Sequence, residues 1–335
     1  MAAQPLNKIL VIQTAFIGDA ILATGILEKL HQYYPTTQID FLVRKGNEGL
    51  FAQHPFIHQL LVWDKKNGKY KNLLNTLKII RNNKYDLAVN LQRFAASGFL
   101  TAFSKAKKTI GFSKNPLSFL FTQKVEHQYN HHEIVRNHYL ISAITDNEAA
   151  KPKLYPSATD YKKVEEYKTI PYICIAPASV WFTKQFPKEK WVEFLNAIPA
   201  PINVYLLGAP NDAALCNEII NVVTNTNTSC TNLAGELSLL QTTALMRDAV
   251  MNYTNDSAPL HLASSINAPA RAMFCSTVSS FGFGPLSDNS SIIETDLQLD
   301  CRPCGLHGHK ACPKGHFKCA LSIDVHKMVS AINKS

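Results

Sequence analysis

Residues 8–34 limit the possible folds more than any other stretch of this sequence. Residues 8–13 are a short apolar run rich in Ile and Val, which is typical of a buried parallel strand. From Ala20 onward, apolar side chains recur at helical spacing, and Gly18 and Asp19 lie in the turn before them. We predict a strand, a glycine turn and a helix N-terminus, whose first backbone N–H groups lack internal partners and can receive an anion.

The carboxylate of Asp19 at this helix start has two interpretations. An Asp at the N-cap satisfies one orphan N–H group and favours the positive end of the helix dipole. A chemical role is the second interpretation, and the position alone favours neither. The dinucleotide fingerprint G-x-G-x-x-G is absent from the segment.

Strand and helix patterns alternate along the chain in two series. The predicted strands are 8–13, 38–43, 59–63, 85–91 and 109–112 in the first series and 172–176, 203–207, 250–253 and 271–274 in the second. The predicted helices are 70–82, 132–143, 188–197, 211–222, 239–247 and 257–265. A polar stretch with two prolines, residues 151–170, is the predicted linker. The predicted fold class is α/β, with two doubly wound domains facing an interdomain cleft at the carboxyl ends of their strands.

Charge and hydropathy narrow the range of partners. The 335 residues carry a net charge of +9, with a pI of about 9.0, which favours an anionic partner. Lysines are scattered along the chain instead of forming one basic tail, so we expect no nucleic acid partner. No apolar run is long enough to span a bilayer, and residues 1–7 are too short and polar for a signal peptide. We therefore expect a cytoplasmic protein.

Two polar turns in the second series are candidate ligand sites. The first follows the predicted strand 172–176 and contains Ser179, a hydrogen-bond donor, and Lys184, which could neutralise a phosphate. An exposed loop lysine is the plainer interpretation of Lys184. The second follows the strand 250–253 and places Asp256, Ser257 and Ala258 at a helix start, with His261 one turn later. The plainer interpretations here are an N-cap aspartate and a core histidine.

Taken together, these motifs resemble a known enzyme family. The Gly18-Asp19 turn, the stretch from Ser179 to Lys184 and the segment from Asp256 to His261 look like those of the ADP-heptose:lipopolysaccharide heptosyltransferases of glycosyltransferase family 9. The resemblance covers nearly the whole chain. It implies a two-domain GT-B fold and an inverting, metal-independent transfer of a sugar from a nucleotide donor.

The resemblance also implies roles for individual residues. Asp19 matches the catalytic base, Lys184 the lysine on the donor phosphate, and Asp256 the carboxylate near the heptose hydroxyls. The residues implied beside the diphosphate are Ser257, Ala258 and His261. Ser257 and Ala258 replace the usual Thr-Gly pair, which keeps a hydroxyl but adds a Cβ where glycine would let phosphate come closer.

The electrostatics of the sequence agree with a reaction that needs no metal cofactor. The chain has no D-x-D motif to hold a divalent cation on a diphosphate. Leaving-group charge would then be stabilised by Lys184 and by helix N-termini. The acceptor is expected on the first domain, where Arg93, Lys105 and Lys108 are the candidate contacts for a phosphorylated glycolipid.

A Cys-rich segment at 301–319 has no counterpart in the alternating pattern. Cys301, Cys304, Cys312 and Cys319 have the number of ligands needed by a structural zinc, although their spacing is not that of a standard zinc ribbon. Disulfides and free thiols are the alternatives.

The resemblance therefore implies a heptosyltransferase of lipopolysaccharide biosynthesis. The predicted domains are an acceptor domain at 1–155, a donor domain at 170–320 and a C-terminal helix at 321–335. The predicted partners are an ADP-sugar, a phosphorylated glycolipid and the cytoplasmic surface of the inner membrane. A GT-B transferase using another nucleotide sugar, or a non-catalytic protein that binds a nucleotide sugar or nucleic acid, is the alternative.

Overall fold

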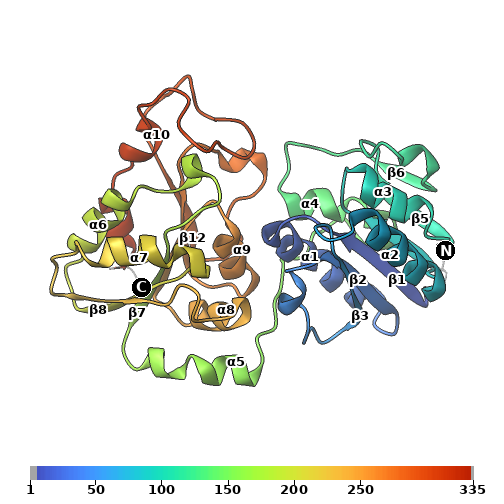
Figure 1. Cartoon of the computed structure of the whole chain (residues 1–335), viewed down its shortest axis with the longest axis horizontal. Helices are drawn as coiled ribbons and strands as arrows, with labels where there is room; N and C mark the ends of the chain where they lie inside the picture. Colours follow the sequence, from blue (N-terminus) through green and yellow to red (C-terminus); the bar gives the residue numbers. More distant parts are fainter. Residues whose placement is uncertain (1–5, 333–335) are drawn as a thin grey trace. The chain divides into compact units, whose positions relative to one another are not determined.

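The chain folds into two compact α/β units. The computed structural model describes residues 6–332. The first unit ends at Tyr155, and the second unit begins at Pro156 (Figure 1). The predicted ranges 1–155 and 321–335 both extend into residues outside the described part. Within residues 6–332, no helix combines the length and the apolar character needed to cross a membrane.

A parallel sheet forms the centre of the first unit. Its strands are β1 (Lys8–Gln13), β2 (Gln38–Arg44), β3 (Ile57–Trp63), β4 (Leu87–Asn90), β5 (Lys108–Phe112) and β6 (Gln123–Val125). They are ordered β3-β2-β1-β4-β5-β6, and every neighbouring pair is parallel. The strand order therefore reverses between β1 and β4.

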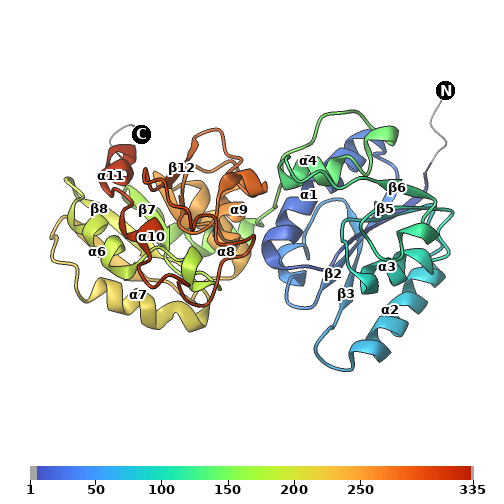
Figure 2. The same ribbon diagram turned by 90° about the horizontal axis from the view of Figure 1, so that it is seen from above.

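Helices cover both faces of this sheet. They are α1 (Ile17–Tyr33), α2 (Lys69–Asn83), α3 (Ala95–Ala102) and α4 (Glu133–His138). The helix α1 packs on β1, β2 and α4, whereas α2 and α3 pack together on the other face (Figure 2). Thr76, Leu77 and Ile80 form the buried stripe of α2. Leu77 and Ile80 belong to the same core cluster as Leu10 and Ile12 of β1. This amphipathic pattern fixes which side of α2 faces the sheet.

The second unit repeats the same topology. Its strands are β7 (Tyr172–Ala176), β8 (Ile202–Leu206), β9 (Thr228–Asn232), β10 (Met251–Asn255), β11 (Ala270–Phe274) and β12 (Ser290–Glu294). They are parallel and ordered β12-β11-β10-β7-β8-β9, so the strand order reverses between β7 and β10.

The helices of the second unit complete the same arrangement. They are α5 (Ala158–Lys163), α6 (Lys188–Asn196), α7 (Ala213–Ile220), α8 (Leu239–Arg247), α9 (Ala258–Ser265), α10 (Lys318–Leu321) and α11 (His326–Ile332). Short 3₁₀ turns occur in both units. Those of the first unit are η1 (Glu48–Leu50), η2 (Ser118–Leu120) and η3 (Ser142–Ile144), and those of the second are η4 (Glu165–Lys168), η5 (Phe182–Lys184), η6 (Pro210–Asp212) and η7 (Ser279–Phe281). Tyr253 of β10 donates to the backbone carbonyl of Met328 at 2.8 Å, which joins α11 to the core.

The predicted α/β fold class, with two doubly wound Rossmann-like domains, is confirmed. The strands β1 and β7 and the helix α8 have their predicted bounds. The sequence did not predict β6, β9, β12 or α3, because these segments are short or lack an apolar run. The predicted linker 151–170 contains α5, which begins with a capping box between Ser157 and Asp160.

Candidate functional site

Asp19 lies in the first turn of α1, directly after β1. The helix begins at Ile17, not at Ala20, and its N-cap is Phe16, whose extended backbone provides no side-chain cap. The interpretation of Asp19 as an N-cap residue is therefore wrong. A carboxylate in the first turn still benefits from the helix dipole.

The ends of β1 and β4 are tied together where the strand order of the first sheet reverses. Thr14, after β1, donates to Gln92, after β4, with an oxygen–oxygen distance of 2.5 Å. Arg93 follows and donates to the hydroxyl of Tyr129 at 2.8 Å. Asp19 and Arg93 thus both lie beyond the carboxyl edge of the sheet, at the position where doubly wound sheets bind ligands.

A second carboxylate, Glu133, lies close to Asp19. Glu133 begins α4, which packs on α1, and its buried carboxylate accepts from Arg136 at 3.2 Å. Burial, followed by the charge of Asp19, raises the pKa of Glu133 to about 7, and Arg136 opposes that shift. Arg136 also donates to the backbone carbonyls of Gln128 and Tyr129. The ion pair therefore anchors the loop that carries Tyr129.

Cations surround the exposed ring of Tyr129. Lys114 Nζ lies 4.1 Å from the ring centroid, and the guanidinium carbons of Arg93 and Arg136 lie at 5.5 and 6.0 Å. A hydrogen bond from Lys114 is the largest cause of the lowered pKa of the Tyr129 hydroxyl. Burial, together with the same cations, lowers the pKa of His127 to about 4. This cluster can receive an anion.

The predicted acceptor residues do not form one group. Lys108 is the first residue of β5 and pairs with Leu87 at the start of β4, whereas Arg93 follows the end of β4. Lys105 lies beside the C-terminal half of α2. Because the strands are parallel, Lys108 is at the opposite edge of the sheet from Arg93 and Asp19.

Asn255 organises the corresponding position in the second unit. The side chain of Asn255, at the end of β10, is fully buried and donates to the carbonyl of Pro177 at 2.8 Å. Its oxygen accepts from the backbone N–H of Phe186 at 2.8 Å. Asn255 thereby holds both ends of the turn that contains Ser179 and Lys184. The backbone N–H of Ser179 donates to Gln185 at 3.2 Å within this turn.

The structure brings Lys184 and Asp256 together. Lys184 ends η5, and its Nζ lies 2.7 Å from a carboxylate oxygen of Asp256, which directly follows β10. The same oxygen accepts from the buried hydroxyl of Thr277 at 2.7 Å. Both partners of the ion pair are largely buried, with side chains 16% and 8% exposed. Lys184 is therefore not a plain solvated loop lysine.

Ser257, Ala258 and His261 lie at the start of α9. Ser257 is the N-cap, with an extended backbone and no side-chain cap bond, and Ala258 is the first helical residue. His261 is buried one turn further along. The predicted donor residues from Ser179 to His261 thus gather beyond β7 and β10 of one unit.

The Cys-rich segment packs directly against the Lys184 turn. The backbones of Thr183 and His309 are hydrogen bonded at 3.1 Å, and the N–H of His309 donates to the Thr183 hydroxyl at 2.8 Å. Gly308 has a φ of +74°, and a Cβ there would lie 2.8 Å from that hydroxyl and 3.1 Å from Lys184 Cγ. Arg302 donates to the carbonyl of Thr277 at 2.9 Å. The segment therefore supports both halves of the Lys184–Asp256 pair.

The predicted zinc at Cys301, Cys304, Cys312 and Cys319 is not supported. Within the described part of the chain, no three His, Cys, Asp or Glu side chains are arranged to hold a metal ion. All eight cysteines are free thiols, so the disulfide alternative is not supported either. The segment's visible contribution is its packing against Thr183, Lys184 and Thr277.

Comparison with known proteins identifies the family. Residues 74–312 match the family described as glycosyltransferase family 9 (heptosyltransferase). The chain belongs to glycosyltransferase family 9. This family 9 protein is 26% identical, over 80% of its own length and 79% of the relative's, to the lipopolysaccharide core heptosyltransferase OpsX of Haemophilus influenzae. The prediction of a glycosyltransferase is confirmed.

Solved structures agree on the fold of this family 9 protein. A family 9 glycosyltransferase from Veillonella parvula matches with a TM-score of 0.84 at 19% identity, covering 98% of both chains. The ADP-heptose lipopolysaccharide heptosyltransferase II of Escherichia coli matches with a TM-score of 0.79 at 20% identity, again over 98% of both chains. The predicted GT-B fold is confirmed.

Proposed function

We propose that this protein transfers heptose from ADP-heptose to an inner-core acceptor of lipopolysaccharide, with inversion and without a catalytic metal. One observation supports this most strongly. Ser179 and Lys184 follow β7 and the Asp256 segment follows β10, whereas Asp19 follows β1 of the other sheet. Each group lies where its own sheet reverses its strand order, which suits a donor site on one unit and a base on the other. The names of the Haemophilus and E. coli relatives support the same donor and acceptor.

In the proposed donor complex, the diphosphate lies at the N-terminus of α9. The backbone N–H groups from Ser257 onward and the ammonium of Lys184 supply positive charge there. Asp256 accepts from the heptose hydroxyls while its contact with Lys184 keeps that ammonium in place. His261 lies further along the helix and Ser179 on the adjoining turn.

The proposed reaction is a single displacement at the anomeric carbon. The acceptor hydroxyl oxygen forms a bond to that carbon while the bond from the carbon to the phosphate oxygen breaks. The hydroxyl proton passes to Asp19, and the bonding electron pair leaves on ADP beside Lys184 and α9. Glu133, with its raised pKa, can keep a proton near neutral pH, which leaves Asp19 as the carboxylate that accepts one.

The proposed acceptor site is the cluster of Arg93, Lys114 and Tyr129. These side chains lie at the same sheet edge as Asp19, and they would bind a phosphate of the glycolipid. Lys105 and Lys108 lie at the opposite edge, so we assign them to a membrane-facing surface instead. The reaction would then take place at the cytoplasmic face of the inner membrane.

Substitution of Asp19 tests the proposed function. We expect Asp19→Asn to fold normally, to bind ADP as the wild type does and to lose kcat by roughly 10²–10⁴-fold, because the general base is removed. Transfer is measured with ADP-heptose and a soluble inner-core acceptor in the presence of EDTA. Asp160→Asn is the control, since Asp160 also lies in a first helical turn, that of α5. Full turnover by Asp19→Asn, or abolition of wild-type turnover by EDTA, would contradict the mechanism.

A further inference from the structure

The positive charge of the chain is concentrated in one stretch of the first unit. Residues 65–125 contain thirteen Lys and Arg and a single acidic residue, Asp86, which gives this stretch a charge of +12. The net charge of the whole chain is +9, so the remaining residues carry −3 together. Asp86 is buried and paired with Lys107 at 2.7 Å, so its charge is largely hidden from the surface. The charged side chains of this stretch are therefore almost all cationic.

Helix α2 combines this charge with exposed apolar side chains. Tyr70, Leu74, Lys78 and Arg81 share one face of α2, because they are spaced by three or four residues. Tyr70 is 74% exposed and Leu74 is 58% exposed. The helix has no acidic residue. Exposed apolar side chains next to Lys and Arg on one helix face are suited to a surface that is both anionic and apolar.

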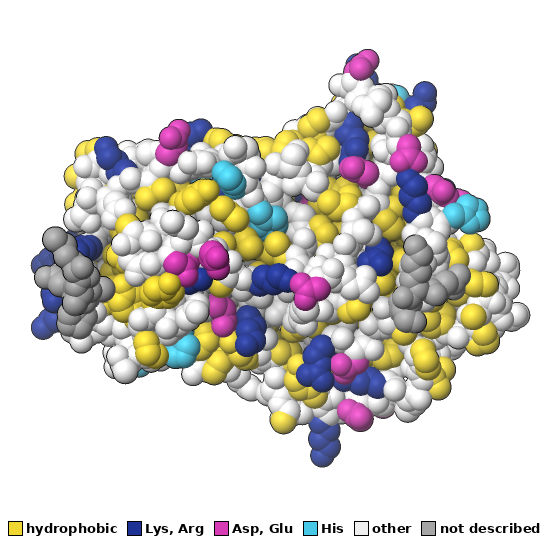
Figure 3. All heavy atoms as spheres, turned by 180° about the vertical axis from the view of Figure 1, so that it is seen from behind, with side chains coloured by type: hydrophobic (Ala, Val, Ile, Leu, Met, Phe, Trp, Pro, Cys, Tyr) yellow, Lys and Arg dark blue, Asp and Glu magenta, His cyan; other side chains and the backbone are white. Residues whose placement is uncertain are grey.

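The surface continues beyond the end of the helix. Lys84 and Lys105 join Leu74, Lys78 and Arg81 around a shallow hollow at the C-terminal half of α2. We define the α2 surface as Tyr70, Leu74, Lys78, Arg81, Lys84 and Lys105. In Figure 2, α2 runs along the outside of the first unit beside α3, and its outward side is not covered by other elements of that unit. Figure 3 is viewed from the side opposite to α2, and the Lys and Arg side chains on that face lie beside Asp and Glu side chains.

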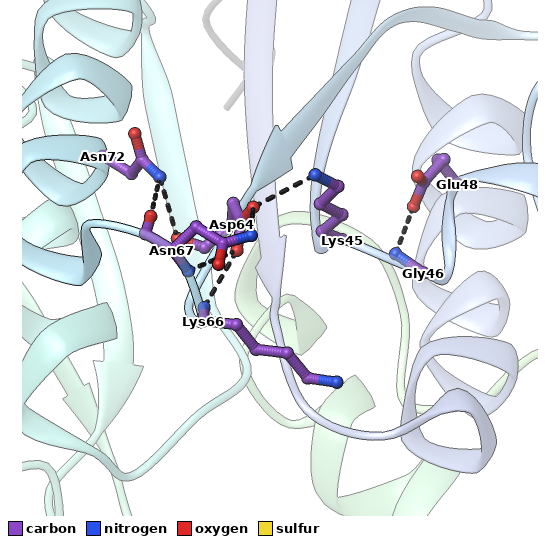
Figure 4. Close-up of polar contacts among 7 residues, drawn as sticks. All are labelled: Lys45, Gly46, Glu48, Asp64, Lys66, Asn67 and Asn72. Atoms are coloured by element: carbon purple, nitrogen blue, oxygen red, sulfur yellow. Dashed lines mark hydrogen bonds and ion pairs between the residues drawn. The ribbon is translucent and has the colours of Figure 1, made fainter.

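The loop before α2 engages its acidic residue, Asp64, in hydrogen bonds. The carboxylate of Asp64 accepts from the backbone N–H groups of Lys66 and Asn67 at 2.9 and 3.1 Å and from Lys45 at 3.1 Å (Figure 4). The Asn67 and Lys66 hydrogen bonds keep the pKa of Asp64 far below its usual range. Figure 4 shows the Lys66 side chain extending away from this network. Asp64 therefore fixes the turn and leaves Lys66 unpaired with it.

We propose that the α2 surface docks the protein on an anionic lipid bilayer. Apolar insertion by Tyr70 and Leu74, with Lys and Arg at the headgroup level, is how interfacial helices bind membranes. The positive charge of the α2 surface could also attract nucleic acid, but nucleic acid offers no apolar partner for Leu74. This inference rests on the proposed function, because the proposed glycolipid acceptor resides in a membrane.

The docking geometry also serves the site. Helix α2 is about 22 Å long, and its first turn follows β3 at the carboxyl edge of the sheet. Asp19 and Arg93 follow β1 and β4 at this same edge. A bilayer along the whole of α2 therefore extends from the opposite edge, where Lys84 and Lys105 lie, to the edge that carries the base.

Vesicle binding by the full-length protein tests the proposal. Sedimentation with phosphatidylglycerol-containing vesicles is compared with phosphatidylcholine vesicles over a series of salt concentrations. We expect preference for the anionic vesicles and a loss of affinity of roughly fivefold for each basic residue removed in Lys78→Ser/Arg81→Ser. Tyr70→Ser/Leu74→Ser should also weaken vesicle binding. The remaining binding should be more sensitive to salt, because it depends on charge alone.

Matched controls lie on the second unit. Lys162→Ser/Lys163→Ser removes two exposed lysines of α5, and Val222→Ser/Leu321→Ser removes two exposed apolar side chains. Both controls should bind vesicles like the wild type. All variants should retain turnover with a soluble, delipidated acceptor, so loss of docking is distinguished from failure of the proposed function. Equal binding to both vesicle types, α2 variants that bind like the controls, or tighter binding of duplex DNA than of anionic vesicles at the same salt would overturn the proposal.

Discussion

Individual side chains in the site perform different tasks, and the sequence revealed only some of them. Asp19, Lys184 and Asp256 each follow a strand closely, where a polar residue is conspicuous among apolar runs. Thr277 and Glu133 gave no such signal, because their importance depends on a partner far away in the sequence. Thr277 binds Asp256 across 21 positions, and Glu133 is affected by Asp19 through the packing of two helices.

The pKa of Glu133 leads to a prediction about stability. Its folded-state pKa of about 7 lies above its ordinary value of 4.5, so the protonated form favours the folded state. This contribution is fully present below pH 4.5 and is lost as the pH rises through 7, which amounts to about 3 kcal/mol. Arg136 and Asp19 face the same carboxyl, and their opposing effects are included in the shift.

Urea unfolding of Glu133→Gln at several pH values measures this contribution. The free energy of unfolding of the wild type should fall relative to that of Glu133→Gln by up to about 3 kcal/mol between pH 4.5 and 8. Glu165→Gln, at an exposed position in η4, should follow the wild type. Parallel curves for the wild type and Glu133→Gln would show that Glu133 ionises freely in the folded protein.

At the scale of elements, the sequence predicted strands better than it predicted the role of the Cys-rich segment. Apolar runs such as 8–13 and 172–176 define their own strands, since burial on both faces demands them. The cysteine spacing suggested zinc, but the described residues show packing against the Lys184 turn instead. No feature of the sequence indicated this contact, because a glycine such as Gly308 in a Gly-rich loop is not distinctive before the fold is known.

Gly308→Ala should disturb this contact. The Cβ would press on Thr183 and Lys184, and the positive φ would add about 1–2 kcal/mol of strain. We expect ADP affinity, measured by calorimetry, to fall about tenfold or more, because Lys184 is displaced. The backbone φ of Gly315 is +72°, and no atom lies within 4 Å of a Cβ built there. Gly315→Ala therefore measures the backbone strain alone. Gly315→Ala should lower the free energy of unfolding without changing ADP affinity. Equal ADP affinity of Gly308→Ala and Gly315→Ala would show that the Cys-rich segment does not support the donor site.

At the scale of the whole molecule, the two units have separate cores and separate tasks. One core cluster lies in the first unit, with residues from Leu10 to Leu100, and another in the second, with residues from Ile173 to Ala331. The proposed donor residues lie only in the second unit, and the proposed base only in the first. The alternating pattern made this division predictable, whereas the strand order had to come from the structure.

This division predicts that ADP stabilises one unit selectively. At about 100 times its Kd, ADP should stabilise the second unit by about 2.7 kcal/mol, because it binds the folded form of that unit only. Hydrogen exchange followed by mass spectrometry should then slow in β7, β10 and α9 and stay unchanged in β1 and β4. Lys184→Ala should abolish the protection, while Lys188→Ala, which removes an exposed ion pair with Glu218, should preserve it. Equal protection of β1 and β10 would mean that the nucleotide is held by both units, and the assignment of the donor to the second unit alone would be wrong.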